Sequence, residues 1–295
     1  MKDIIKIIFF ILLFNTFSSN TNVFSSEITL PFELKGDIDN DTIEETIKIS
    51  KNDKDKYDFT AIFEIIKNNE ILYSDICGHR IFQCSIENLK KKEKAIFLFS
   101  WATNASGTGV DVIRWNGKKY EKIFTQQTWT ARIEKLGKNS KKQILLKNRY
   151  DIPKIYEYDE ILDKFIRVDM NYPEIYHKII KEIEEKLKTY ENPSPESYVA
   201  MLQNVKCYLV LRNYKQVENL CKNYYERENK IDEWKELKLN IKNDCKTYLT
   251  KREELIKKYR SDDENHLISM YLNDNDDYRI LMYKLEMIKT GWKEY

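Results

Sequence analysis

The chain has 295 residues, of which 42% are hydrophobic and 33% are charged, and its formal net charge is +2. With this length and apolar content the chain can bury a sizeable core, and we expect two domains. The nearly balanced charge gives no reason to expect nucleic acid as a partner.

Residues 1–25 have the pattern of a secretory signal peptide. Lys2 and Lys6 supply positive charge, Ile7–Phe14 supplies an apolar run, and Val23–Ser25 offers small residues where cleavage usually occurs. The apolar run is too short for a comfortable membrane span, and no later segment is apolar enough to cross a bilayer. We therefore expect an exported protein, periplasmic or secreted, without a stable transmembrane segment after cleavage. An uncleaved N-terminal anchor is the alternative.

An acidic loop, Gly36–Glu45, follows this segment and runs directly into an apolar stretch. Acidic side chains alternate along the loop, and side chains two residues apart can turn inward onto one point. Ca²⁺ takes about six to eight oxygen ligands. The spacing therefore predicts a calcium site whose ligands are the carboxylates of Asp37, Asp39, Asp41 and Glu45 and the backbone carbonyl of Ile43. An acidic turn without an ion is the alternative.

The loop is not an EF-hand, because that motif needs a Gly and a Glu where this chain has Thr42 and Lys48. It resembles instead the calcium loop of integrin-type FG-GAP (VCBS-like) repeats, Gly-Asp-x-Asp-Gly-Asp-Gly-x-x-Asp, with matches at Gly36, Asp37, Asp39, Asp41 and Glu45. The resemblance implies β-repeats that stack like propeller blades. Asn40 and Thr42 replace the two inner glycines. Asn tolerates a left-handed backbone, whereas β-branched Thr adopts it only at a cost.

From Glu27 to about Val168 the chain alternates short apolar stretches with polar turns, which indicates β-strands. Asn116-Gly117 is a strong hairpin signal. The expected strands are Glu44–Ile49, Phe59–Ile66, Ala95–Trp101, Gly109–Trp115, Tyr120–Phe124, Gln143–Leu146, Lys154–Tyr158 and Phe165–Val168.

A weak internal repeat has a spacing of about fifty residues and comprises residues 43–49, 92–98 and 141–146. It predicts three blade-like units, of which only the first keeps an acidic loop, because lysines replace the acids in the other two. Three units cannot close a ring of the usual four to eight blades. The domain is therefore an open fragment, a small twisted sandwich or part of an assembly.

After Met170 the apolar residues recur with helical period. Helices are expected from Pro173, from Pro195 after a Ser194 cap and from Tyr214, then a long one through Trp234–Tyr259 and two more from Ser261 and Asp276. Tyr208, Tyr214, Val217 and Cys221, with Val205 where Gly is usual, resemble a tetratricopeptide repeat. The resemblance implies a helical hairpin that binds a partner; a generic pair of antiparallel helices is the alternative.

These patterns together predict an α+β chain of two domains. An antiparallel β-repeat domain, propeller-blade-like, would occupy residues 27–169, and a tetratricopeptide-like α-helical hairpin domain would occupy residues 171–295.

Export permits disulfides, and Cys77 and Cys84 close a short loop in which they can pair. Cys207, Cys221 and Cys245 lie in the helical region, where their odd number allows at most one further intrachain bridge. Buried free thiols are the default interpretation for all of them. The absence of any Cys-x-x-Cys pair excludes the common zinc motifs.

The sequence contains no recognisable catalytic motif, so we expect a non-enzymatic binding or scaffold protein with an unidentified protein or peptide partner. Residues 86–154 hold 16 Lys/Arg against 6 Asp/Glu, so this face either attracts an anionic polymer or is solvated or docked against the acidic residues upstream. Trp101, Trp115 and Trp129 either line a groove or serve packing. The alternative functions are an envelope enzyme acting on glycan and adhesion to an anionic cell-wall polymer.

Overall fold

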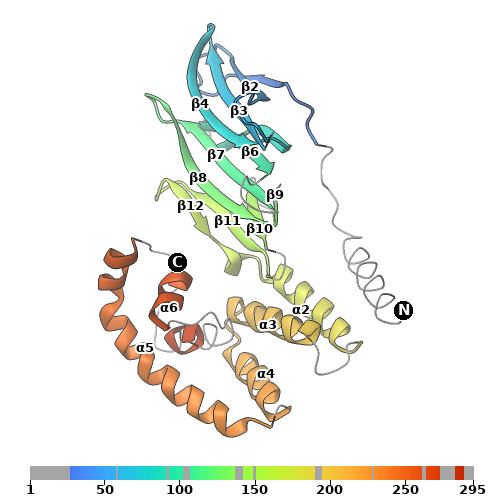
Figure 1. The fold of residues 1–295 in the computed structure, drawn as a ribbon, viewed down its shortest axis with the longest axis vertical. Helices are drawn as coiled ribbons and strands as arrows, with labels where there is room; N and C mark the ends of the chain where they lie inside the picture. Colours follow the sequence, from blue (N-terminus) through green and yellow to red (C-terminus); the bar gives the residue numbers. More distant parts are fainter. Residues whose placement is uncertain are drawn as a thin grey trace. The chain divides into compact units, whose positions relative to one another are not determined.

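The computed structural model describes residues 27–57, 59–90, 93–101, 107–136, 142–148, 151–189, 195–227, 229–260, 264–272 and 283–288. The described chain is α+β, with three four-stranded antiparallel sheets followed by helices (Figure 1). The expected signal segment lies outside the described residues. Among the described helices, none has both the length and the apolar character that a membrane span requires.

The first sheet contains β1 (Phe32–Gly36), β2 (Glu45–Lys51), β3 (Thr60–Lys67) and β4 (Glu70–Gly78), paired in that order. Burial alternates from residue to residue along β2 and along most of β3, so one face of each strand is buried, as a period of two requires. Asn68 and Asn69 form the turn between β3 and β4 with φ of 52° and 67°. Two consecutive left-handed residues are typical of a tight hairpin.

The second sheet contains β5 (Ile81–Lys90), β6 (Glu93–Trp101), β7 (Thr108–Trp115) and β8 (Tyr120–Thr128), again paired in chain order. Six consecutive residues of β6, Ala95–Ser100, are buried, so this strand is covered on both faces. The predicted turn at Asn116-Gly117 joins β7 to β8, with Gly117 at φ 90°.

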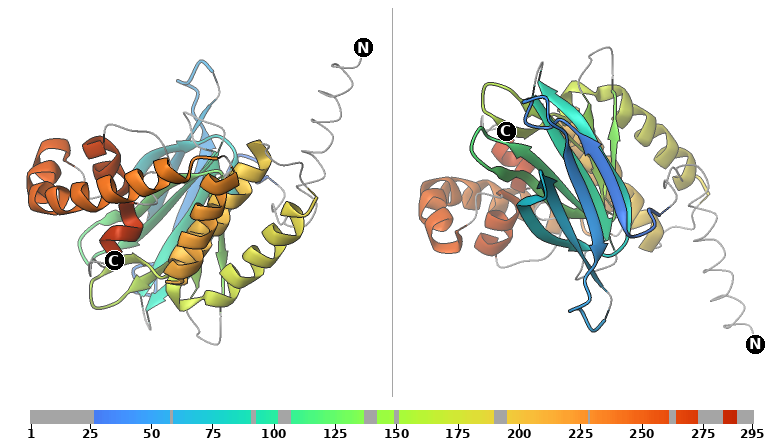
Figure 2. Two further views of the ribbon diagram at one scale, coloured as in Figure 1. Left: turned by 90° about the horizontal axis from the view of Figure 1, so that it is seen from below. Right: turned by 90° about the horizontal axis from the view of Figure 1, so that it is seen from above.

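The first two sheets pack on one another through a shared apolar core (Figure 2). The first sheet contributes residues such as Ile47, Phe63 and Ile65, and the second contributes Ile96 and Leu98. At one point the two backbones approach closely, because a Cβ built on Gly78 would lie 1.7 Å from the carbonyl oxygen of Trp101.

The third sheet contains β9 (Thr130–Glu134), β10 (Gln143–Lys147), β11 (Lys154–Asp159) and β12 (Lys164–Arg167), and it too is a meander of sequence neighbours. The three stretches of the internal repeat form β2, β6 and β10, each of which is the second strand of its sheet. The fifty-residue period therefore corresponds to one four-stranded sheet per repeat.

All eight predicted strands are present, with ends that differ by a few residues, and β1, β4, β5 and β9 are additional. The strands β4 and β5 lack a clean alternation: neither buries one face throughout, and both carry polar residues within their spans. Such strands cannot be recognised from apolar periodicity; they form because neighbouring strands pair with them.

A 3₁₀ turn, Asp169–Asn171, leads into the helices α2 (Pro173–Leu187), α3 (Pro195–Val210), α4 (Tyr214–Arg227), α5 (Ile231–Tyr259) and α6 (Glu264–Leu272); residues 283–288 are also helical. The first four helices follow the predicted apolar stripes. The predicted caps at Ser194 and Ser261 and the helix start at Asp276 lie outside the described residues. Arg212 and Arg260 end α3 and α5 in left-handed conformations.

The backbone forms two compact units. Unit 1 comprises Met1–Arg132 with Tyr158–Phe165, and unit 2 comprises Ile133–Glu157 with Ile166–Tyr295. Unit 2 therefore combines β10 and the first part of β11 with the helices. Division into a β-repeat domain ending at residue 169 and a helical domain starting at residue 171 remains a prediction.

Candidate cation site in the first loop

The loop between β1 and β2 is held in a compact shape by its own side chains. The Asp41 amide donates to Asp39 Oδ1 at 3.2 Å, and the Ile43 amide donates to Asp41 Oδ1 at 2.9 Å. Asn40 and Thr42 adopt left-handed backbones, with φ of 62° and 77°. These are the two positions at which the FG-GAP pattern has its inner glycines, so the local backbone has the conformation that such glycines permit.

Three of the predicted ligands converge. Asp37, Asp39 and Glu45 each offer a carboxylate oxygen, and these oxygens lie within 4.8 Å of one another. Glu45 is fully buried, and its Oε2 accepts a hydrogen bond from the Ile38 amide at 2.7 Å. An all-oxygen donor set of this kind suits a hard divalent cation such as Ca²⁺. The role of the Ile43 carbonyl as a ligand stays a prediction.

A lysine ammonium binds the same carboxylates. Lys67, the last residue of β3, places Nζ at 2.6 Å from Asp39 Oδ2, 2.7 Å from Asp41 Oδ1 and 2.6 Å from Glu45 Oε1. Burial alone would lower the pKa of Lys67, but the hydrogen bonds to the carboxylates outweigh it, and the net pKa lies well above its usual range. Lys67 also holds the pKa of Asp41 below its usual value.

Two buried oxygens near this cluster have no hydrogen-bond partner among the described residues. They are Asp37 Oδ1 and the hydroxyl of Tyr120, a side chain of which only 3% is exposed. Burial raises the pKa of Tyr120, and the negative charges of Glu45 and Asp39 raise it further, so the hydroxyl lies within the field of the loop. Buried polar atoms of this kind call for a partner, which the described residues do not supply.

The charges at the loop do not balance. Four carboxylates face the ammonium of Lys67 and that of Lys94, whose Nζ donates to the backbone oxygen of Asp37 at 2.7 Å. If all are ionised, two negative charges remain, a number that one divalent cation would compensate.

Lys67 is not among the residues predicted from the sequence for this site, although strand register could have identified it. Thr46 of β2 pairs with Ile66 of β3, so the next residue of β3 lies opposite Glu45. Lys67 follows directly after the predicted strand Phe59–Ile66. Pairing the two predicted strands with their apolar faces aligned would have placed a lysine beside the acidic loop.

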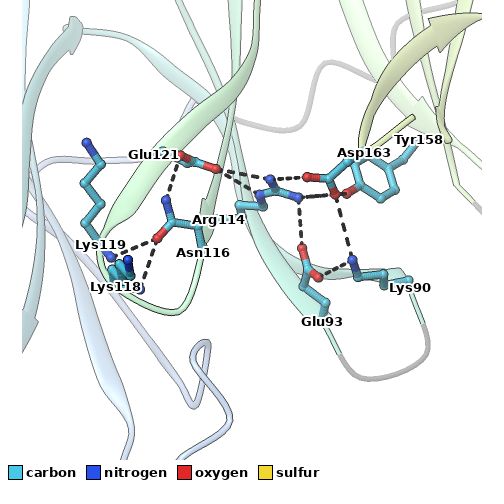
Figure 3. Close-up of polar contacts among 9 residues, drawn as sticks. All are labelled: Lys90, Glu93, Arg114, Asn116, Lys118, Lys119, Glu121, Tyr158 and Asp163. Atoms are coloured by element: carbon cyan, nitrogen blue, oxygen red, sulfur yellow. Dashed lines mark hydrogen bonds and ion pairs between the residues drawn. The ribbon is translucent and has the colours of Figure 1, made fainter. Parts of the chain in front are cut away.

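A second polar cluster in unit 1 centres on Arg114 of β7 (Figure 3). Its guanidinium forms a two-pronged contact with Asp163, at 2.7 and 2.6 Å, and also contacts Glu121 at 3.1 Å and Glu93 at 3.3 Å. The Tyr158 hydroxyl accepts from Arg114 at 2.8 Å and donates to Asp163. The pKa of Asp163 is lowered, mainly by Arg114 and then by Tyr158. The bidentate geometry indicates a structural clamp between strands and the β11–β12 turn.

Part of the basic segment is paired with acidic residues. Besides Arg114, Lys122 of β8 contacts Asp75 at 2.6 Å and Asp111 at 3.3 Å. In these pairs the positive charge is compensated within the protein, so it is less available to bind an anionic polymer. Adhesion to such a polymer therefore stays a prediction with fewer free lysines to support it.

The three tryptophans of the predicted groove differ in their surroundings. Trp115 packs against Tyr120, with ring centroids 5.1 Å apart, and belongs to the core of unit 1. Arg80 lies over the ring of Trp101, 5.3 Å from its centroid. Trp129 is exposed over 41% of its surface. The packing alternative therefore holds for Trp115.

The five cysteines are free thiols in this structure. Cys77 and Cys84 both contact the core of unit 1, and burial raises the pKa of each to about 12; the proximity of Cys77 adds to the shift at Cys84. The disulfide between them stays a prediction. Cys207, Cys221 and Cys245 are buried, as the default interpretation held.

Comparison with protein-family models gives no match, and comparisons with curated proteins and with solved structures give none either.

Proposed function

We propose that this chain is a non-enzymatic binding protein that acts outside the cytoplasm. Its β-sheets form a support in which a cation, Ca²⁺ in our proposal, holds the first loop. Its helices present a surface to a protein or peptide partner. The FG-GAP and tetratricopeptide resemblances support this division of roles, and the internal repeat of four-stranded sheets is compatible with the first of them.

The observation that carries the proposal is the serial packing of the helices. Contacts between neighbouring elements join α2 to α3, α3 to α4, α4 to α5 and α5 to α6, each helix packing mainly on the next. Such serial packing is typical of helical repeat proteins, which use the surface of the stack for binding.

The α3–α4 hairpin supports a tetratricopeptide-like arrangement in detail. Val205, Val217 and Cys221 are fully buried between helices, and Tyr208 and Tyr214 pack against the same core. The αL residue Arg212 closes α3, and Asn213 then caps α4 through its side chain, which accepts from the Gln216 amide at 3.3 Å. The short connection makes the two helices antiparallel neighbours.

The test is retrieval of a partner that depends on the helical surface. The chain from Glu27 onward, tagged and immobilised, is incubated with extracts of the cell envelope. Leu239 of α5 and Met270 of α6 are apolar and exposed by 60% and 42%. The double variant Leu239→Lys/Met270→Lys should lose the partner while its circular dichroism stays unchanged.

The matched control is Ile71→Lys, which charges an equally exposed apolar residue in unit 1 and should keep the partner. Partner loss with the control but not with the helical variant would reject the assignment of binding to the helices. Hydrolysis of envelope glycan by the purified chain would favour an enzyme instead. Retention on cell walls that moderate salt abolishes would favour adhesion to an anionic polymer.

A further inference from the structure

We propose that Lys67 is a built-in competitor of Ca²⁺: its ammonium and the metal ion use the same carboxylate oxygens of the first loop, so calcium binds only by displacing the lysine. This inference rests on the proposed cation loop and assigns to it a regulator that the FG-GAP resemblance does not imply.

The contact distances place the two cations in competition for the same carboxylates. Nζ of Lys67 lies 2.6 Å from an oxygen of Asp39 and 2.6 Å from an oxygen of Glu45, two of the three acids whose oxygens converge. A calcium ion would lie at about 2.3–2.6 Å from its ligands. Both cations cannot approach the same oxygens at these distances.

Lysine satisfies the loop only in part. An ammonium has three protons to donate, and those of Lys67 are directed to Asp39, Asp41 and Glu45. Asp37 Oδ1 and the Tyr120 hydroxyl stay buried without a hydrogen-bond partner among the described residues. A calcium ion has six to eight ligand positions, so it offers places for Asp37 and for a water that reaches Tyr120.

Displacement of Lys67 is sterically accessible. The ammonium sits at the end of a flexible four-carbon stem, anchored at the last position of β3. One of its partners, Asp41, has 48% of its side chain exposed, so the cluster opens to solvent on that side. The lysine can leave toward water without moving the strand.

The experiment compares calcium binding by the chain from Glu27 onward and by its Lys67→Met variant. Calorimetric titration with Ca²⁺ measures affinity directly. Titration with Tb³⁺ gives a second readout, because Tyr120, which lies near the loop and packs against Trp115, can sensitise its luminescence. Since the variant no longer has to expel an ammonium, we expect it to bind Ca²⁺ at least tenfold more tightly than the unaltered chain.

Lys94→Met is the matched control. It also removes one positive charge next to the loop. Lys94, however, donates to the backbone oxygen of Asp37 and not to a loop carboxylate. We expect its calcium affinity to change less than threefold. Equal affinities in the unaltered chain and Lys67→Met would overturn the proposal, as would equal gains in the two lysine variants, which would indicate general electrostatics.

Loss of Lys67 can unfold the loop, because Glu45 is then left buried without its counter-charge. In that case circular dichroism is recorded with Ca²⁺ and with a chelator. Refolding of Lys67→Met by Ca²⁺ alone supports the exchange, and failure to refold overturns it. Partner capture through the helical surface is measured separately, so failure of calcium competition is distinguishable from failure of the proposed function.

Discussion

At the scale of single residues, the first loop shows what a local pattern can and cannot reveal. Convergence of Asp37, Asp39 and Glu45 followed from their spacing, since alternate side chains share one side of a tight loop. The contact between Lys67 and Glu45 joins residues that are 22 positions apart in the sequence, and it depends on pairing between two strands. Arg114 and Asp163 are 49 residues apart. Such contacts arise from tertiary structure, which residue spacing does not encode.

Thr42 carries a backbone conformation that its side chain disfavours. Its φ of 77° is in the left-handed region, where a β-branched residue costs about 1–2 kcal/mol. Thr42→Gly should therefore stabilise the protein by about 0.5–1 kcal/mol, after allowing for the greater freedom of glycine in the unfolded chain. Urea unfolding followed by fluorescence measures the change. Thr46→Gly, in the regular strand β2, should destabilise by a similar amount, and a stabilising effect there would contradict the argument.

The Asp163 carboxylate should make stability depend on acid pH. Hydrogen bonds from Arg114 and Tyr158 lower its pKa in the folded protein relative to an unfolded value of about 3.9. Its contribution is therefore present above about pH 4 and is lost as pH falls through the folded pKa. Asp163→Asn should be less stable than the unaltered chain at pH 7, and the difference should shrink toward pH 3, as read from urea midpoints.

Asp159→Asn serves as its control, because Asp159 binds backbone amides of Ile161 and Leu162, which an asparagine oxygen can also do. The difference in stability between Asp163→Asn and the unaltered chain could instead stay constant down to pH 3. That result would show that Arg114 does not act through the charge of Asp163.

The thiols of Cys77 and Cys84 should be unreactive in the folded protein. Their pKa values of about 12 leave little thiolate at pH 8; Cys77 is buried and Cys84 is partly buried. Maleimide labelling followed by mass spectrometry should modify them only after denaturation. If the predicted disulfide forms after export, denatured protein kept without reductant would take up two labels fewer than reduced protein.

At the scale of secondary-structure elements, concentrations of apolar residues identified strands that are extensively buried, such as β2, β7 and β10. They passed over β4 and β5, whose inward positions are mixed with polar residues. The turn at Asn116-Gly117 was recognisable from sequence. The turn at Asn68-Asn69 was not predicted, although Asn also tolerates positive φ. The helices were better defined, because their apolar stripes extend over several turns.

Gly78 lies where two strands approach so closely that an added side chain would not fit. A Cβ at this residue would meet the Trp101 carbonyl oxygen at 1.7 Å, and a backbone atom cannot rotate away. Gly78→Ala must therefore push β4 away from β6, at a cost of about 2–3 kcal/mol. Thermal unfolding should show a clearly lower midpoint.

Gly109→Ala is the comparison for this prediction, since its added Cβ would lie 3.6 Å from the Ser100 carbonyl oxygen, an ordinary contact. Its effect should stay within about 0.5 kcal/mol. Equal losses in the two alanine variants would mean that glycine flexibility, and not the close approach at Gly78, explains the result.

At the scale of the whole molecule, the order of strands and helices along the chain could be predicted, but the division into compact units could not. The switch from period two to helical period near Met170 is visible in the sequence. Assignment of β10 and Lys154–Glu157 to the unit of the helices depends on apolar contacts of residues such as Leu145 and Ile155 with Tyr176 and Ile180 of α2. A change of period marks a change of secondary structure, not necessarily the edge of a core.

The two kinds of packing should differ in their resistance to local opening. Strands β2, β3 and β6 lie inside sheets and bury many apolar side chains, whereas α4 and α5 contact mainly their neighbours in sequence. Hydrogen exchange measured by mass spectrometry should therefore be slowest in β2, β3 and β6 and faster in α4 and α5. Faster exchange in these strands than in the helices would contradict the expected ranking.

The meander connectivity of the three sheets has a kinetic consequence. Every strand pairs only with strands next to it in the chain, so each sheet closes short loops and needs no distant segment. Such local topology favours rapid folding. Each sheet can assemble as soon as its own fifty or so residues have emerged from the ribosome, and a chain halted between repeats would already hold its earlier strands in order.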